Sequence, residues 1–273
     1  MSGARPEDYT LAEMMCIAAA RLLPSQGNAL AGLGPPILSG VLAKVLYAPD
    51  LTFSTEVGAI DWRPDPATAT RAPVGIHDEL LNVNVALTSD MIESLGTYLM
   101  GGNVDVGLLT GAQVDRFGNL NVLCLGPYEQ PARRFAGTGG NTEIAGLSGA
   151  VVILMPQEPR RFVERCDFIT SAGYISGPGA RRRAGLRPQG PNYVVSTMGV
   201  YQYDTPDGGD SGSCELVLTG VFPNVDPEVV QALVPWPLKL ADRIDLVPPP
   251  TVEEIRWLRR LDPYRYYLTP GRY

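Results

Sequence analysis

Short apolar runs that alternate with glycine turns and helical stretches constrain the fold of this chain more than any other feature. Residues 28–33 are expected to be extended, and a Gly32-Leu33-Gly34 turn leads into residues 35–47, a helix opened by prolines, which a first turn tolerates. Residues 51–55, rich in β-branched and aromatic side chains, are the next strand. This order predicts an α/β fold.

The rest of the pattern predicts a mixed sheet. Thr10 and Glu13 form a capping box for a helix over residues 11–22, which Pro24 ends. Residues 105–113 and 120–125 are strand-like and joined by a Gly/Asn turn, which implies an antiparallel pair. We also expect strands at 150–155, 162–170, 193–203 and 214–218, helices at 90–100, 225–228 and 251–261, and a loop over 61–73. With no internal repeat or clear linker, residues 1–273 are expected to form one α/β domain, an open mixed sheet flanked by helices.

Composition excludes several classes of protein. Of the 273 residues, 45% are hydrophobic and 19% charged, which excludes wholesale disorder. The net charge of −7 argues against nucleic acid as the main partner, because phosphate binding calls for a basic surface. No apolar run reaches the roughly 18–20 residues of a membrane span, and residues 1–8 lack the basic-then-apolar order of a signal peptide. We therefore expect a cytoplasmic protein with no membrane partner.

Histidine and cysteine chemistry has little support. His77 is the only histidine and lies in polar, proline-rich surroundings typical of a loop, which disfavours a Ser-His-Asp or multi-histidine metal site. Cys16, Cys124, Cys166 and Cys214 are far apart and show no CxxC spacing. Neither a disulfide framework nor a zinc site is expected, and buried thiols are the better interpretation. No metal is predicted.

Two glycine-rich segments have different meanings. Gly32-Leu33-Gly34 resembles half of a dinucleotide fingerprint, but Ile37 occupies the third glycine position, so a tight turn is favoured over a Rossmann cofactor site. The phosphate-cradling pattern GxxxxGK[ST] is absent. In Gly137-Thr138-Gly139-Gly140-Asn141, three glycines let backbone N–H groups point into one concavity, which suits an oxyanion or a carboxylate. A mobile surface loop is the alternative.

Charged residues supply two further candidates. Glu56 lies where a strand ends and is followed closely by Gly58, and catalytic side chains on α/β sheets tend to lie at strand ends; an ordinary exposed carboxylate is the alternative. Seven arginines fall within a short stretch and would suit an anionic ligand, an acidic partner, or an intrachain salt-bridge network on a solvated face. They are Arg160, Arg161, Arg165, Arg181, Arg182, Arg183 and Arg187.

Ordered segments along most of the chain, from about residue 10 to 260, carry a family resemblance. They include Tyr47-Ala48-Pro49-Asp50, Thr55-Glu56-Val57-Gly58, Gly111-Ala112-Gln113-Val114-Asp115, Gly118-Asn119-Leu120-Asn121, Arg134-Phe135-Ala136-Gly137-Thr138-Gly139-Gly140-Asn141, Arg160-Arg161-Phe162, Asp167-Phe168-Ile169-Thr170-Ser171, Gly177-Pro178-Gly179 and Gly185-Leu186. Together they resemble the β subunit of class I CoA-transferases, with the glutaconate CoA-transferase branch closest. A series of ordered matches is more specific than any one of them.

The resemblance implies an open fold of the CoA-transferase (sugar-isomerase-like) type, with the active site between an α and a β subunit. Glu56 falls on the family's nucleophilic glutamate, which would form a glutamyl-CoA thioester while CoA moves from an acyl-CoA to a carboxylic acid. Coenzyme A is then a substrate, and no cofactor is bound permanently. In the usual pattern Ser-Gly or Asn-Gly follows the glutamate, whereas this chain has Val57-Gly58, which removes a polar group beside the nucleophile.

The remaining site residues follow from the same resemblance. The backbone N–H groups of Gly139, Gly140 or Asn141, in the loop that Gly137 opens, are expected to bind the acyl oxygen. Val57, Gly58, Gln113 and Tyr128 are candidate pocket residues. Two other functions remain: one component of a hydrolase that cleaves a carbon–carbon bond of a cyclic CoA thioester in steroid degradation, and a ligand-sensing module without catalysis.

Overall fold

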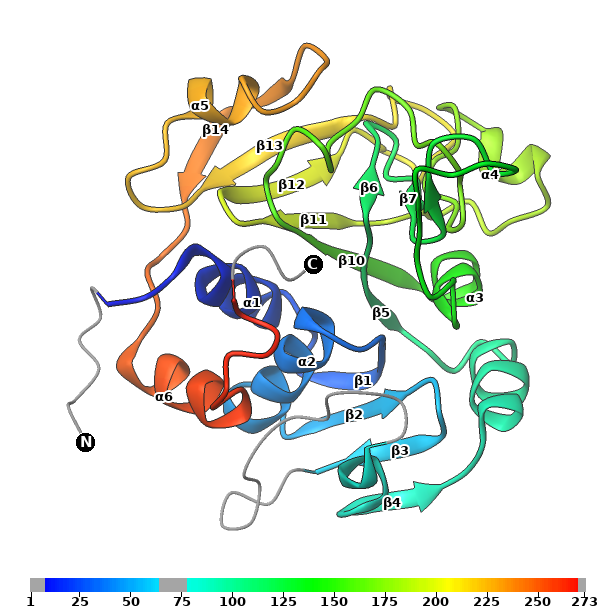
Figure 1. The fold of residues 1–273 in the computed structure, drawn as a ribbon, viewed down its shortest axis with the longest axis vertical. Coiled ribbons are helices and arrows are strands. Elements are labelled where there is room, and N and C mark those ends of the chain that lie inside the picture. The colour runs from blue at the N-terminus through cyan, green and yellow to red at the C-terminus, as the bar shows by residue number, and fades with distance from the viewer. Residues whose placement is uncertain (1–7, 64–77, 270–273) are drawn as a thin grey trace.

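The computed structural model describes residues 8–63 and 78–269, and its central element is an eight-stranded sheet (Figure 1). The strand order is β14 (Lys239–Leu246), β13 (Leu216–Val221), β12 (Gly199–Tyr203), β11 (Tyr193–Ser196), β10 (Ala150–Met155), β5 (Val106–Thr110), β1 (Gln26–Ala31) and β2 (Asp50–Thr55). Strand β12 runs antiparallel to both its neighbours, and the other paired strands are parallel. The expected open mixed sheet is confirmed.

The predicted strand–helix–strand unit places the end of β2 beside two other strand ends. Strand β1 leads through the Gly32-Leu33-Gly34 turn into α2 (Pro35–Leu46), and α2 leads into β2. Ala31, the last residue of β1, is paired with Thr55 of β2 and with Leu108 of β5. Because parallel strands end at the same edge of a sheet, residues that follow β1, β2 and β5 meet there.

Three helices cover one face of the sheet: α1 (Leu11–Arg21), α2 and α6 (Val252–Leu261) (Figure 1). Their apolar faces are fully buried in a core with β1, β2 and β5, to which α1 contributes Ile17, α2 contributes Leu42 and α6 contributes Ile255. The predicted capping box begins α1: Glu13 N donates to Thr10 Oγ1 over 3.2 Å, and Thr10 N donates to Glu13 Oε2 over 2.8 Å.

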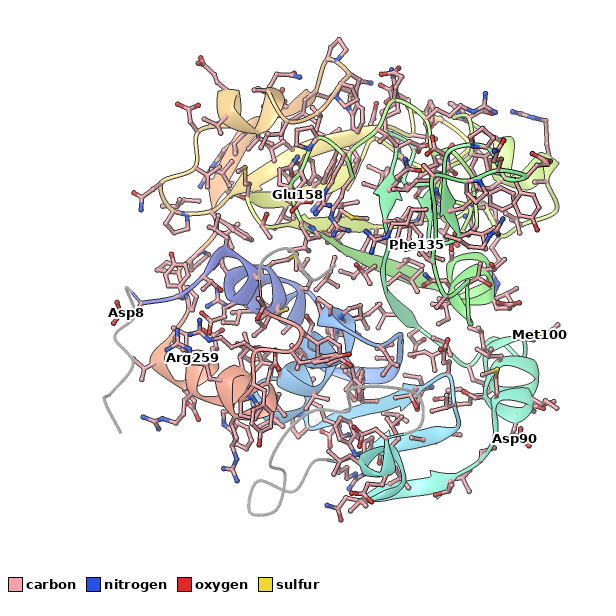
Figure 2. The ribbon with its side chains drawn as sticks, viewed as in Figure 1. Asp8, Asp90, Met100, Phe135, Glu158 and Arg259 are labelled. Atoms are coloured by element: carbon pink, nitrogen blue, oxygen red, sulfur yellow. The ribbon has the colours of Figure 1, made fainter. Side chains whose placement is uncertain are left out.

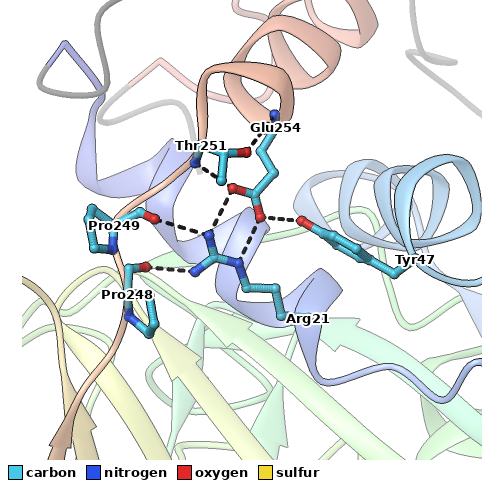
Figure 3. Close-up of polar contacts among 6 residues, drawn as sticks. All are labelled: Arg21, Tyr47, Pro248, Pro249, Thr251 and Glu254. Carbon is cyan, nitrogen blue, oxygen red and sulfur yellow. Dashed lines mark hydrogen bonds and ion pairs between the residues drawn. The ribbon is translucent and has the colours of Figure 1, made fainter.

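Figure 3 shows how the end of α1 is tied to α6. Arg21 donates from Nε and Nη2 to the two carboxylate oxygens of Glu254, over 2.7 and 2.8 Å. Arg21 also donates to the carbonyl oxygens of Pro248 and Pro249, and the Tyr47 hydroxyl donates to Glu254. One carboxylate therefore joins the first turn of α6 to α1 and to the residue that follows α2.

The other face of the sheet carries α3 (Asn141–Leu147), η2 (Ile92–Leu99) and two short hairpin strands, β6 (Gln113–Val114) and β7 (Leu120–Asn121). Asp90 and Met100, labelled in Figure 2, mark the ends of the η2 segment. Its last turn is wide, with Met100 N donating to Leu95 O, five residues back, over 3.1 Å. The β6–β7 hairpin confirms the predicted antiparallel turn, although β5 belongs to the main sheet.

Some predicted elements are wrong. Asp61 and Trp62 were expected in a loop but belong to β3 (Ala59–Trp62), which pairs with β4 (Val85–Thr88); the Trp62 ring lies 6.5 Å from that of Phe53, so packing rather than local pattern decides. Residues 64–73 of that loop lie outside the described residues. Residues 162–170 form no strand, only a single bridge between Phe162 and Val114.

The predicted strand at 193–203 is two strands, β11 and β12, because Ser196 Oγ accepts from Met198 N and Gly199 N and turns the chain. Strand β14 was not predicted, since its charged, largely exposed residues lack a strand pattern. The capped helix at 225–228 is confirmed as α5 (Pro227–Gln231), with Asp226 accepting from Glu228 N. The remaining elements are η1 (Glu79–Asn82), β8 (Cys124–Leu125), β9 (Arg133–Arg134) and α4 (Ala180–Arg183).

All four cysteines are free and buried, as expected. Within the described ranges no helix combines the length and apolar character that crossing a membrane requires. His77 lies outside the described residues.

Candidate functional site

Glu56 follows β2 directly and sits in a tight turn. Gly58 N donates to Thr55 O over 3.2 Å, and Ser89 N donates to Gly58 O over 2.8 Å. Gly58 has φ +97°, and a Cβ there would collide with the Ser89 carbonyl group, so the turn requires glycine. Sheet edge and turn together aim the half-buried Glu56 side chain toward α3.

The triple-glycine segment holds the Glu56 carboxylate. Gly140 N donates to Glu56 Oε2 over 2.7 Å. A Cβ on Gly139 would lie 3.1 Å from Oε1, and a Cβ on Gly140 would lie 2.7 Å from Oε2. The carboxylate thus packs directly on the glycine backbone, where any side chain would displace it.

The three candidate N–H donors of this loop have different partners. Gly140 N–H is taken by Glu56, and Asn141 N donates to Thr138 O over 3.0 Å, within the loop itself. Gly139 N has no acceptor in the part of the chain that the structure describes. The Asn141 side chain donates to Thr110 O over 3.3 Å and so ties the start of α3 to the end of β5.

Helix η2 supports the other side of the site, a contribution that the sequence did not reveal. Ser94 Oγ donates to Thr55 O over 3.0 Å and fixes the end of β2. The Leu95 side chain packs against Gly140, with Cδ2 3.1 Å from where a Cβ on that glycine would be. Nothing in the helical spacing of this segment distinguishes these two residues from ordinary packing residues.

Burial sets the electrostatics of Glu56. It raises the pKa of this carboxyl group above its ordinary value of 4.5 because the charged form loses hydration. The hydrogen bond from Gly140 N acts in the opposite direction, and the nearby charge of Glu143 adds to the rise. A desolvated carboxylate held by one N–H is a better nucleophile than a fully hydrated one.

A cavity of about 430 Å³ adjoins the glycine loop. Gly137 and Asn141 line it on the loop side, and the remaining lining combines apolar and cationic side chains. These include Val122, Leu125, Phe135, Arg133, Arg160 and Arg161. A second cavity, of about 360 Å³, shares Thr110 and Arg161 with the first.

The other pocket candidates lie elsewhere. Val57 packs on the core beneath α1 and α2. The buried Gln113 side chain accepts from Asn121 Nδ2 and Asp167 N and donates to Asp167, so its amide group is engaged within the protein. Tyr128 is half exposed and stacks on Phe168 at 5.5 Å. Their role in substrate binding stays a prediction.

The arginine-rich stretch does not form one patch. Arg181 is buried and donates to the carbonyl oxygens of Ala172 and Gly173. Arg182 pairs with Asp210 at the surface. Only Arg160 and Arg161 reach the cavity. Across residues 8–63 and 78–269, no group of three or more His, Cys, Asp or Glu side chains is placed to hold a metal ion.

Comparison with known proteins gives consistent relatives. Residues 12–210 match the family described as Coenzyme A transferase. The β-type subunit of the 3-oxoadipate CoA-transferase of Pseudomonas knackmussii is 34% identical over 93% of this chain and 94% of that relative. The crystal structure of glutaconate coenzyme A-transferase from Acidaminococcus fermentans superposes with a TM-score of 0.85 and 29% identity, covering 96% of this chain and 98% of that chain. The IpdB component of the cholesterol ring-cleaving hydrolase of Rhodococcus jostii is more distant, at 26% identity over 73% of this chain and 74% of that relative.

Proposed function

This chain belongs to the coenzyme A transferase family, and from that premise we propose that it is the β subunit of a heteromeric CoA-transferase in which Glu56 is the nucleophile. The observation that carries the assignment is the Glu56 carboxylate held at a strand end by Gly140 N. Coenzyme A is a substrate, and no permanently bound cofactor is needed. Of the rival functions, the family match favours an enzyme over a sensing module.

The reaction that suits this carboxylate proceeds through two kinds of acyl intermediate. Glu56 attacks the thioester carbonyl carbon, the C–S bond breaks, and a mixed anhydride and CoA thiolate form. The thiolate then attacks the glutamyl carbonyl carbon, giving a glutamyl-CoA thioester and the free carboxylate of the donor. An acceptor carboxylate repeats these steps in reverse, so CoA leaves on the new acyl group and Glu56 is restored. Holding the reactants together contributes an effective molarity on the order of 10⁵ M or more.

The glycine loop has two separate tasks in this scheme. When thiolate attacks the glutamyl carbonyl carbon, negative charge develops on a Glu56 oxygen, and Gly140 N–H already donates to that carboxylate. When Glu56 attacks the substrate, charge develops on the substrate acyl oxygen instead. Gly139 N–H is the donor of this loop that the described residues leave unused, and we assign it to that second oxygen.

A second chain is needed to complete the site. Glu56 is only half buried in this chain alone, whereas an acyl anhydride survives only where water is excluded. We propose that an α subunit closes over this edge of the sheet and supplies much of the CoA contact. The named relatives are themselves single subunits of larger enzymes, which supports this partner.

An exchange assay with matched carboxylate variants tests the assignment. The complex of this chain with its α subunit should transfer CoA from an acyl-CoA to acetate. Glu56→Ala should abolish transfer, whereas Glu143→Gln, which removes the neighbouring carboxylate, should retain most of it. Transfer that persists in Glu56→Ala would exclude Glu56 as the nucleophile.

The ring-cleaving hydrolase remains the second candidate function, because a more distant relative carries that name. Omitting the acceptor acid separates the two. A transferase releases at most one carboxylate per active site and then stalls as its enzyme thioester, whereas a hydrolase continues to turn over.

A further inference from the structure

Three arginines line the cavity that adjoins the Glu56 loop, which is an unusual concentration of positive charge for an acidic chain. We propose that this cavity binds the acyl group of the thioester, and that Arg161 and Arg133 select acyl groups that end in a second carboxylate. The inference rests on the proposed transfer function and deepens it by naming the class of acyl group.

Arg161 is fixed in place while part of its guanidinium group stays unused. The residue is 4% exposed, Nε donates to Glu158 Oε2 over 3.1 Å, and Nη1 donates to Gly111 O over 3.0 Å. Among the described residues no acceptor lies within hydrogen-bond reach of Nη2. Because Arg161 lines the cavity, these N–H groups are available to a carboxylate, for which the planar guanidinium fork is well suited.

The arginines outnumber their counter-charges. Glu158 accepts from both Arg160 and Arg161. Arg133 makes no ion pair in the part of the chain that the structure describes, and its guanidinium carbon lies 5.2 Å from the ring centre of Phe135. Phe135 and Glu158, both labelled in Figure 2, lie in the same central region of the molecule. Positive charge around this cavity is therefore only partly compensated.

The Arg161 guanidinium is electrostatically disfavoured without a ligand. Burial lowers the pKa of Arg161, Glu158 opposes this change, and the like charges of Arg160 and Arg133 add to it. An entering carboxylate would compensate these charges, and its own desolvation would be offset by charge-assisted hydrogen bonds.

The rest of the lining fits the chain of such an acyl group. Val122, Leu125 and Phe135 offer apolar surface to a short hydrocarbon chain, and Gly137 and Asn141 bring one wall to the loop that holds Glu56. The phosphates of CoA are the other anions of this reaction, but the whole pantetheine arm separates them from the reacting sulfur. An anion bound beside the Glu56 loop therefore belongs to the acyl group.

Two thioesters of equal carbon number test the proposal, because they share all of CoA and differ only at the acyl end. With the complex of this chain and its α subunit, and acetate as acceptor, kcat/KM is measured for glutaryl-CoA and pentanoyl-CoA. We expect the wild type to prefer glutaryl-CoA. Arg161→Gln should lower kcat/KM for glutaryl-CoA by about 100-fold and for pentanoyl-CoA by about 3-fold or less.

Arg133→Gln keeps the test valid if the buried Arg161 proves necessary for folding. Arg133 is exposed, and its replacement should cost about 10-fold with glutaryl-CoA alone. Arg243→Gln, on the edge strand β14 with a side chain 88% exposed, is the matched control and should change neither value.

Equal losses with both thioesters in Arg161→Gln and Arg133→Gln would overturn the proposal, because the arginines would then serve CoA binding or the fold. A wild type without preference for glutaryl-CoA would also overturn it, while leaving the transfer function intact. If the wild type transferred CoA from neither thioester, nor from any other acyl-CoA, the proposed function itself would fail.

Discussion

Gly140 holds Glu56 through a backbone hydrogen bond of 2.7 Å that joins two segments 84 residues apart in sequence. One segment ends strand β2, and the other precedes helix α3. The carboxylate rests on a surface of bare backbone, so its position depends on the absence of a side chain at Gly140 as much as on the bond itself.

Replacing Gly140 by alanine should therefore reduce activity without unfolding the protein. The backbone at Gly140 has φ −80°, which alanine adopts readily, but its Cβ would lie 2.7 Å from Glu56 Oε2 and 3.2 Å or less from two Leu95 atoms. Loss of one positioned N–H donor typically costs about 100-fold in kcat. We expect a drop of that order in the exchange assay, with an unchanged circular dichroism spectrum.

Gly146→Ala is the matched control for this experiment. Gly146 lies in the same helix, and the nearest atom to an added Cβ is Leu186 Cδ2 at 3.8 Å, an ordinary contact. Its activity should equal that of the wild type. Full activity in Gly140→Ala would show that the glycine loop does not position the nucleophile.

Neutralising Glu56 should stabilise the protein at neutral pH. Because burial raises the pKa of Glu56 in the folded state, the charged form is destabilising, and this cost is absent below the ordinary value of 4.5 and complete once the pH exceeds the folded pKa. Glu56→Gln should raise the free energy of unfolding by about 0.5–2 kcal/mol at pH 8, as for other active-site replacements. Thermal unfolding of both proteins at several pH values measures this, and a gain that shrinks as the pH rises would contradict it.

Glu254 should show the opposite pH dependence. Burial alone would raise its pKa, but hydrogen bonds from Arg21, Tyr47 and Thr251 outweigh it and lower the pKa to about 2 (Figure 3). The stabilisation is present above the ordinary value of 4.5 and is lost as the pH falls toward 2. Glu254→Gln should cost about 3 kcal/mol at pH 7, because it leaves the Arg21 guanidinium without its charge partner.

The exposed neighbour Glu253 provides the control for that measurement. Glu253→Gln should leave the midpoint of urea unfolding unchanged within error. If Glu254→Gln and Glu253→Gln had the same midpoint at pH 7, the network at α6 would contribute nothing to stability.

Local signals in the sequence were sufficient for the elements that carry Glu56. The β1–α2–β2 unit, the Thr10 capping box and the Asp226 cap each depend on residues close in sequence, and each is found where it was predicted. The chemistry of Glu56 itself is different, because a single carboxylate at a strand end is ambiguous. Its meaning depended on the family resemblance, which the comparisons support.

Long-range contacts account for what the sequence did not reveal. Strands β3 and β14 depend on partners elsewhere in the chain, and their own residues alternate too weakly to predict a strand. Ser94 and Leu95 reach the site from η2, and Arg161 reaches the cavity only after the chain has folded back on Gly111. No spacing along the sequence encodes such approaches.

Mass spectrometry of the trapped intermediate tests the role of Glu56 most directly. The complex with its α subunit is incubated with acyl-CoA without an acceptor, digested with protease under mildly acidic conditions, and searched for a peptide that carries CoA. We expect the CoA mass on Glu56, its absence in Glu56→Ala, and its presence in Glu143→Gln. CoA attached to a different residue, or an unlabelled chain that still exchanges CoA, would contradict the mechanism.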